Sequence, residues 1–232
     1  MSEELMIIEE QYPALTGGGD VAALVAENLD GEDLSPWDLD TIKVPGSGGT
    51  AWTVETLTGD ETFKELDVII VHQKLVRSYW AEGLEESGGG SSPDCFSQDS
   101  IAGIGDPGGD CHGCPMAEFG SADKGSGQAC KQMRQLFVLR PGSMLPTVVT
   151  IPPSSLKNAK KFLLRLASQG SSYRDVVTRL TLEKDKNEAG IVFARVTFAV
   201  AEMVPEDIRS RVLSYANGIK PALERPQREE AA

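Results

Sequence analysis

Residues 66–80 read LDVIIVHQKLVRSYW, and this stretch decides the class of fold. It is rich in β-branched residues, which favour extended backbone, and its apolar residues alternate in part with polar ones. At 15 residues it exceeds the usual strand length, so we expect it to bend or bulge. The stretch therefore predicts one long strand in a β-rich domain.

Further strands are predicted on both sides of this stretch. TIKVP and AWTVETL precede it, LFVL and LPTVVTI follow it, and VVTRLTLEK with VFARVTFAV has the alternation of a hairpin. Prolines, a serine cap and periodic apolar residues predict a helix in residues 152–170, and residues 206–223 form a second helical pattern. We expect a mainly β, α+β chain with two flanking helices. An OB-type barrel with an inserted metal-binding loop is the leading fold.

The chain divides by composition into three parts. Residues 1–40 predict an acidic, partly mobile N-terminal arm, 41–205 an OB-like binding domain with a loop insertion at 90–131, and 206–232 a C-terminal helix and tail. Residues 1–66 contain 15 acidic and two basic residues, whereas residues 131–195 contain 12 basic and four acidic ones. Such asymmetry suggests a basic working surface for an anionic partner.

All four cysteines lie within a glycine-rich stretch of low apolar content: Cys95, Cys111, Cys114 and Cys130. Their spacing is C-x15-C-x2-C-x15-C, and the CxxC pair allows two thiolates to converge on one ion. Four thiolates suit a closed, structural Zn²⁺ site with Zn–S bonds of about 2.3 Å. The alternatives are a Cys3His site in which His112 replaces Cys95, and an iron–sulfur site.

No motif for catalysis is found. The chain lacks a P-loop, G-x-S-x-G, H-E-x-x-H and a dinucleotide fingerprint, and its two histidines do not form a catalytic set. We expect a protein that is not an enzyme. The longest apolar runs are too short to cross a membrane, and the first residues do not resemble a secretory signal, which predicts a cytoplasmic protein without membrane association.

Basic and aromatic residues are interleaved along several predicted strands and one helix. Single-stranded nucleic acid is bound by cations that follow the phosphates and by aromatic rings that stack on the bases. The candidate binding residues are Lys74, Arg77, Tyr79, Trp80, Lys131, Arg134, Arg140, Lys160, Lys161, Tyr173, Arg174, Arg179, Lys184 and Lys186. Arg77 and Tyr79 are two residues apart and can therefore share a face of their strand.

The cysteine pattern is followed by LFVL, LPTVVTIPPSSL, a basic helix and the VVTRLTLEKDKNEAGIVFARVTF hairpin. With these motifs in this order, the chain resembles a group of tailed-bacteriophage proteins. These are regarded as single-stranded DNA-binding or replication and recombination accessory factors. The resemblance covers roughly residues 65–205. It implies an OB-type fold, a structural zinc on the four cysteines, and binding through a basic sheet face. Its setting would be the cytoplasm of a phage host.

Many such binders recruit partners through an acidic C-terminal tail, but here the tail ERPQREEAA is mixed and the acidic stretch is N-terminal. The sequence therefore predicts a protein that binds single-stranded DNA, or RNA, largely without sequence preference, in replication or recombination. Replication proteins would be recruited by the N-terminal arm. The alternative is a zinc-stabilised interaction module that docks on a polymerase or another replication or transcription partner.

Overall fold

The computed structural model describes residues 10–16, 21–82, 92–123, 125–187 and 190–225. The strands are β1 (Thr41–Ile42), β2 (Trp52–Thr56), β3 (Gly59–Phe63), β4 (Glu65–Tyr79), β5 (Cys95–Ser97), β6 (Ala102–Gly105), β7 (Gly109–Asp110), β8 (Lys131–Leu139), β9 (Thr147–Ile151), β10 (Val176–Lys186) and β11 (Val192–Met203). The helices are α2 (Val21–Asn28), α4 (Leu156–Ser168) and α5 (Glu206–Leu223), with short 3-10 turns η1 (Pro13–Leu15), η2 (Pro115–Ala117), η3 (Pro153–Ser155) and η4 (Tyr173–Asp175).

The chain forms two compact units. The sheet unit comprises residues 1–73 and 136–232, and the cysteine unit comprises residues 74–135. In the sheet unit β1, β9, β8 and β4 are neighbours in that order, β10 pairs with β4, and β11 pairs with β10. In the cysteine unit β5, β6 and β7 follow β4 in order. Together the described strands make a mixed sheet of nine strands, and β2 and β3 form a separate hairpin.

The central strands of the sheet unit are buried on both faces. In β4, Leu66, Val68 and Ile70 enter one apolar cluster, whereas Ile69 and Val71 enter another. Side chains of successive strand residues point to opposite faces, so the two clusters lie on opposite sides of the sheet. β8 and β9 divide their apolar residues between the same two clusters. Burial on both faces explains why these strands read as unbroken apolar runs.

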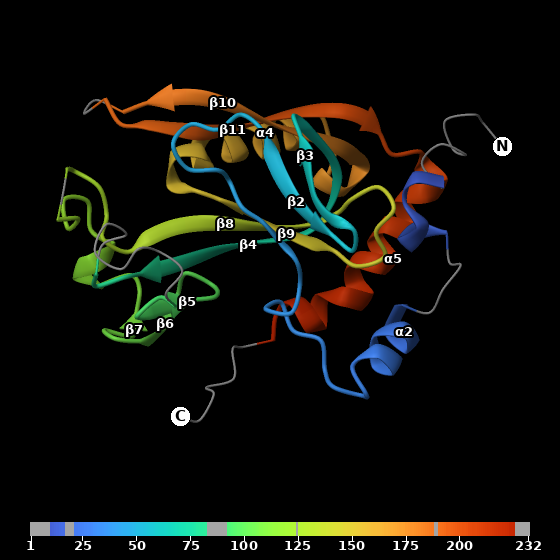
Figure 1. Cartoon of the computed structure of the whole chain (residues 1–232), viewed down its shortest axis with the longest axis horizontal. Coiled ribbons are helices and arrows are strands. Elements are labelled where there is room, and N and C mark those ends of the chain that lie inside the picture. Colours follow the sequence, from blue (N-terminus) through green and yellow to red (C-terminus); the bar gives the residue numbers. More distant parts are fainter. Residues whose placement is uncertain (1–9, 17–20, 83–91, 124, 188–189, 226–232) are drawn as a thin grey trace. The chain divides into compact units, whose positions relative to one another are not determined.

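Different elements cover the two faces. Ile208, Val212 and Ala216 of α5 pack on one face together with Tyr12 and Leu15 of the N-terminal segment. The other face is covered by β2, by α4 and by the β10–β11 hairpin. Figure 1 shows β4, β8 and β9 between α5 on one side and α4 with the hairpin on the other. The N-terminal segment predicted to be partly mobile is therefore anchored where Tyr12 and Leu15 are buried.

The expected α+β class with helices over residues 156–168 and 206–223 is confirmed, and so is the antiparallel hairpin of β10 and β11. The described strands do not close into a barrel, and this differs from the expected OB-type architecture. The physical reason is the covering of both faces. A small barrel has one filled interior and one outer surface, whereas β4, β8 and β9 require two apolar layers.

Helix α4 is attached to β11 by polar contacts as well as by its apolar side. The buried Ser155 hydroxyl accepts a hydrogen bond from the Val196 N–H at 2.9 Å, and the Asn158 side chain donates to the Val196 carbonyl at 3.0 Å. Ala159, Phe162 and Leu166 are buried beneath the helix. These contacts turn the opposite face of α4 to solvent.

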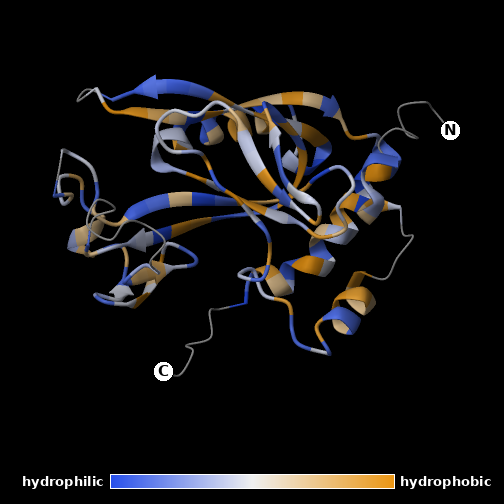
Figure 2. Cartoon of the chain, viewed as in Figure 1, coloured by the Kyte–Doolittle hydropathy of each residue, from blue (hydrophilic) through white to orange (hydrophobic). Residues whose placement is uncertain are grey.

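Figure 2 shows hydrophobic and hydrophilic stretches alternating along α5, as expected for a helix that packs by one face.

Within the described residues, no helix combines the length and the apolar character needed to cross a membrane.

Replacing Ser155 by alanine tests how α4 is held. The change leaves the buried Val196 N–H without its acceptor, so we expect the free energy of unfolding to fall by about 1–3 kcal/mol. Ser154→Ala is the matched control because Ser154 is exposed. The measurement is urea denaturation, and equal stabilities of the two variants would contradict the assignment.

Candidate functional site

The cysteine unit has a small apolar core in which thiols predominate. Its described buried apolar side chains are Val76, Phe96, Cys95, Cys111 and Cys130. A segment that buries so little apolar surface gains little stability from the hydrophobic effect. The cysteines therefore occupy the place that aliphatic side chains fill in an ordinary core.

Pairing of β4 with β5 brings four side chains to one face. Tyr79 lies opposite Cys95, and Arg77 lies opposite Ser97. Residues directly opposite in an antiparallel pair share a face, as do residues two apart on one strand. The prediction that Arg77 and Tyr79 are co-facial is confirmed, and the face they share carries Cys95.

Backbone hydrogen bonds in turns position two further cysteines. The Cys111 N–H donates to the Ile101 carbonyl at 2.8 Å, directly after β7. The Cys130 N–H donates to the Met116 carbonyl in η2 at 2.7 Å, directly before β8. Cys114 precedes η2, whose first residue is a proline. Residues distant in sequence are thus fixed around one point.

Two glycines permit the close approach of these segments. A Cβ at Gly103 would lie 2.8 Å from the Cys95 sulfur. Gly105 has a φ of +104°, and a Cβ there would lie 2.0 Å from the Asp94 carbonyl oxygen. Any larger residue at Gly105 would have both a backbone clash and a strained conformation.

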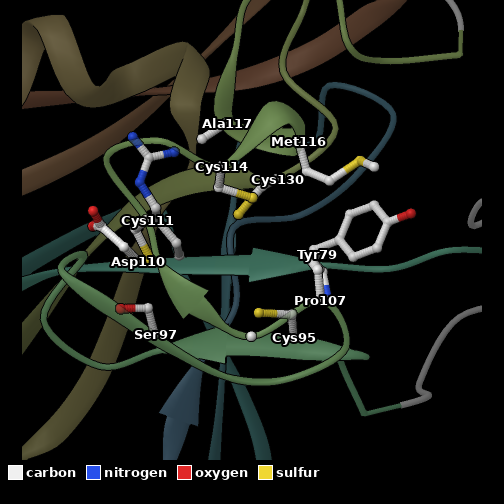
Figure 3. Close-up of a pocket in the computed structure, with 12 residues that line it drawn as sticks. Tyr79, Cys95, Ser97, Pro107, Asp110, Cys111, Cys114, Met116, Ala117 and Cys130 are labelled. Carbon is white, nitrogen blue, oxygen red and sulfur yellow. The ribbon is translucent and has the colours of Figure 1, made fainter.

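The four cysteines line a single small cavity of about 10 Å³. Figure 3 shows Cys95, Cys111, Cys114 and Cys130 arranged around it, with Tyr79 and Met116 at its margin. A volume of this size is close to the minimum that holds one water molecule.

Arg77 and Asp110 are the charged residues that line the cavity. Burial raises the pKa of the Cys130 thiol, and the nearby Arg77 guanidinium opposes that rise. The Nη1 atom of Arg77 is buried and has no hydrogen-bond partner among the described residues. A buried donor without a partner is costly, and thiolates would be better acceptors for it than neutral thiols.

The donor set suits zinc in chemistry and number. Four cysteines and a half-buried Arg77 around one small cavity fit a Zn²⁺ site with four thiolates. Within the described ranges, however, no three His, Cys, Asp or Glu side chains are arranged so as to hold one metal ion. The cysteines share one cavity without the geometry of a coordination sphere.

His112 is placed away from this cavity. Its side chain is exposed and does not line the cavity, while its backbone N–H donates to the Asp110 carboxylate at 2.9 Å. Cys95, the residue it would replace in a Cys3His site, does line the cavity. The geometry favours the four cysteines over the alternative with His112.

Several predicted nucleic-acid-binding residues are already engaged within the sheet unit. Arg179 binds Asp67 through two hydrogen bonds of 2.7 and 2.6 Å, and Glu65 lies 3.2 Å away. Hydrogen bonding to Asp67 raises the pKa of Arg179. Arg174 donates to the Val71 carbonyl at 3.0 Å, and its guanidinium covers the Tyr173 ring at 4.7 Å. Arg179 and Arg174 therefore stabilise the sheet unit through these contacts.

The aromatic candidates are mostly covered. Tyr173 is half-buried and packs against the apolar clusters, and Tyr79 lines the cysteine cavity. Trp80 is 37% exposed and is the predicted platform with the most accessible ring. Stacking of bases therefore has little support among the predicted rings.

The remaining candidates differ in exposure. Lys74 and Arg134 are half-buried, and Arg140 donates to the Thr147 hydroxyl at 3.3 Å. Burial lowers the pKa of Arg134. Lys131 is exposed, and its ammonium donates to the carbonyl of Gln128. Among these four residues, only Lys131 is exposed like the cations on α4.

Exposed basic residues of the sheet unit are grouped on α4 and at the end of β10, whereas Lys43 and Lys64 are exposed singly. Lys160 and Lys161 are exposed on α4, where Lys157 and Arg165 extend the same basic face, and Lys184 and Lys186 are exposed on β10. Lys157 and Arg165 are not among the candidate binding residues, although the helical periodicity already places both on the outward face. Each lies four residues from Lys161 and therefore shares its side of the helix.

A groove in the sheet unit had no counterpart in the sequence prediction. It has a volume of about 880 Å³ and lies between α2, η1 and α5. Its walls include Leu15, Val25, Leu34 and Ile219. No residue of α2 is buried, so the short apolar pattern of this helix faces the groove and solvent.

Comparison of the chain with protein-family models, with curated protein sequences and with solved structures found no match.

Substituting Gly105 by alanine tests the packing around Cys95. The change forces a Cβ against the Asp94 carbonyl at a positive φ, which costs about 1–3 kcal/mol in strain. We expect Cys95 to react faster with Ellman's reagent in metal-free protein. Gly113→Ala is the control, since a Cβ there meets no atom within 4 Å. Unchanged thiol reactivity in the Gly105 variant would count against the described turn.

Proposed function

We propose that this protein binds single-stranded nucleic acid by its phosphate backbone, through the basic face of α4, and that a structural Zn²⁺ on the four cysteines stabilises the cysteine unit. The observation that carries the proposal is the set of exposed cations on α4. Four of its 13 residues are basic, and none is acidic. Phosphate contacts of this kind give affinity without sequence preference.

The geometry of α4 suits an extended anionic strand. Lys157, Lys161 and Arg165 follow one another at intervals of four residues, which places them about 6 Å apart along the helix axis. Lys160 lies beside this row. Among the described residues these four side chains form no ion pair, in contrast to Arg179 and Arg195, which pair with carboxylates. Their charges therefore remain available to an external anion.

The four cysteines would hold the zinc, with Arg77 beside them. Zinc bound by four thiolates supplies folding energy rather than reactivity, because such a site has no open position for substrate. Its role here would be to stabilise the folded cysteine unit, whose apolar core is small. A reducing compartment such as the cytoplasm keeps the thiols free for this purpose.

The biological setting follows from the resemblance to tailed-bacteriophage single-strand binders. Replication or recombination intermediates expose single strands, and a binder that contacts phosphates would cover them irrespective of sequence. The acidic N-terminal segment is the candidate for recruiting replication proteins. The scarcity of exposed aromatic platforms makes electrostatic contact, rather than stacking, the main source of affinity in this proposal.

Neutralising the basic face of α4 tests the nucleic-acid proposal. In a variant with Lys157, Lys160, Lys161 and Arg165 changed to glutamine, we expect weaker binding of labelled oligo-dT. The slope of log affinity against log salt concentration should fall by about 0.7 for each cation that contacts a phosphate. Fluorescence anisotropy in a salt series measures both quantities, and oligo-U in parallel compares RNA with DNA.

The matched control replaces two exposed lysines of the sheet unit that lie outside α4, Lys43→Gln and Lys64→Gln. The control should retain most of the affinity of the natural chain. Equal losses in the two variants would remove α4 as the binding surface. An absence of binding by the natural chain at low salt would end the nucleic-acid proposal altogether.

Metal content tests the zinc proposal independently. We expect one zinc per chain by elemental analysis of protein purified without chelators. Cys95→Ser and Cys130→Ser should lower the content and make residues 74–135 sensitive to protease, because each removes a thiolate ligand. His112→Ala is the control and should retain its zinc. Iron with inorganic sulfide in the preparation would instead support the iron–sulfur alternative.

A second candidate function, docking of a partner protein, is favoured by the groove between α2 and α5. Helical walls with apolar linings suit an amphipathic helix. The charged residues that line the groove are Glu32, Asp33, Arg211 and Arg225, two of each sign, so the apolar face of the helix would supply most of the affinity. Binding of such a peptide in the absence of any nucleic-acid affinity would favour this second function.

A further inference from the structure

Arg77 occupies a position in the cysteine unit that its sequence context did not indicate. It was predicted to contact phosphates, yet β4–β5 pairing directs it to the face of Cys95. It lines the same cavity as the four cysteines. A side chain committed to this cavity is not presented to an external strand.

The charge of a four-thiolate site explains why a guanidinium would be placed there. A divalent ion with four thiolates carries a net charge of −2, and burial makes that charge costly. An adjacent cation offsets part of it. Guanidinium remains charged at all physiological pH values and offers five N–H donors in a fixed plane.

Hydrogen bonding supports the same assignment. The Nη1 atom of Arg77 is buried without a partner among the described residues. The buried residues that line the cavity with Arg77 are Ser97, Cys95, Cys111 and Cys130. Thiolate sulfur accepts hydrogen bonds better than neutral thiol sulfur does. Ionised, metal-bound cysteines would therefore supply the acceptor that Nη1 lacks.

We propose that Arg77 is a positioning residue of the cysteine site, which favours metal binding by balancing the charge of the thiolates and by donating a hydrogen bond to Cys130. This inference rests on the proposed zinc site. Residues beside metal ligands commonly change metal affinity by about 10- to 100-fold when they are replaced.

The test measures Zn²⁺ affinity of the full chain by competition with a chromophoric chelator. We expect Arg77→Met to weaken zinc binding about 10- to 100-fold. Arg77→Lys keeps the positive charge and should recover a substantial part of the lost affinity. Lys64→Met, which removes an exposed charge in the sheet unit, should leave zinc affinity unchanged. Circular dichroism of each variant verifies that it is folded.

The outcomes separate this inference from the zinc proposal. Zinc affinity of Arg77→Met equal to that of the natural chain would overturn the role of Arg77 while leaving the zinc site intact. Equal losses in Arg77→Met and Arg77→Lys would also overturn it, because packing rather than charge would then be the cause. Absence of zinc from the natural chain would instead overturn the zinc proposal.

Discussion

The burial of β4 on both of its faces is the constraint on which the sheet unit depends. The four successive apolar residues of β4 at positions 68–71 point to both faces of the sheet, so the strand requires two covering layers. α5 and the N-terminal segment with Tyr12 supply one layer, and α4 with β2 and the β10–β11 hairpin supplies the other. The basic face of α4 follows from this arrangement, because its apolar side is used for covering.

The cysteine unit meets a different constraint. With Val76 and Phe96 as its described buried hydrocarbon side chains, it cannot rely on apolar burial as the sheet unit does. Its pairing and turns instead gather four thiols and the Arg77 guanidinium around a cavity of about 10 Å³. A proposed metal at this point would join segments that otherwise have few contacts to hold them.

Electrostatics distinguishes the two kinds of basic residue in this chain. Arg179 is bound by Asp67, which is 112 residues away in sequence, and Arg195 pairs with Asp185 across the hairpin. Such arginines contribute to the fold. The cations of α4 have no carboxylate on their own helix, so their mutual repulsion would be relieved by an anionic ligand. Net charge alone could not separate these roles.

Local patterns in the sequence predicted the long strands, both long helices, the hairpin and the grouping of the cysteines, because these features depend on propensity, periodicity and spacing of nearby residues. The strand β3 and the short strands β5, β6 and β7 within the predicted loop insertion were not predicted. They also indicated that Arg77 and Tyr79 share a face. The covering of the sheet on both sides, the pairing of Arg179 with Asp67 and the direction of Arg77 into the cysteine cavity were decided only by tertiary structure. Each of these depends on strand order and on contacts between residues far apart in the chain, and no local pattern encodes such contacts.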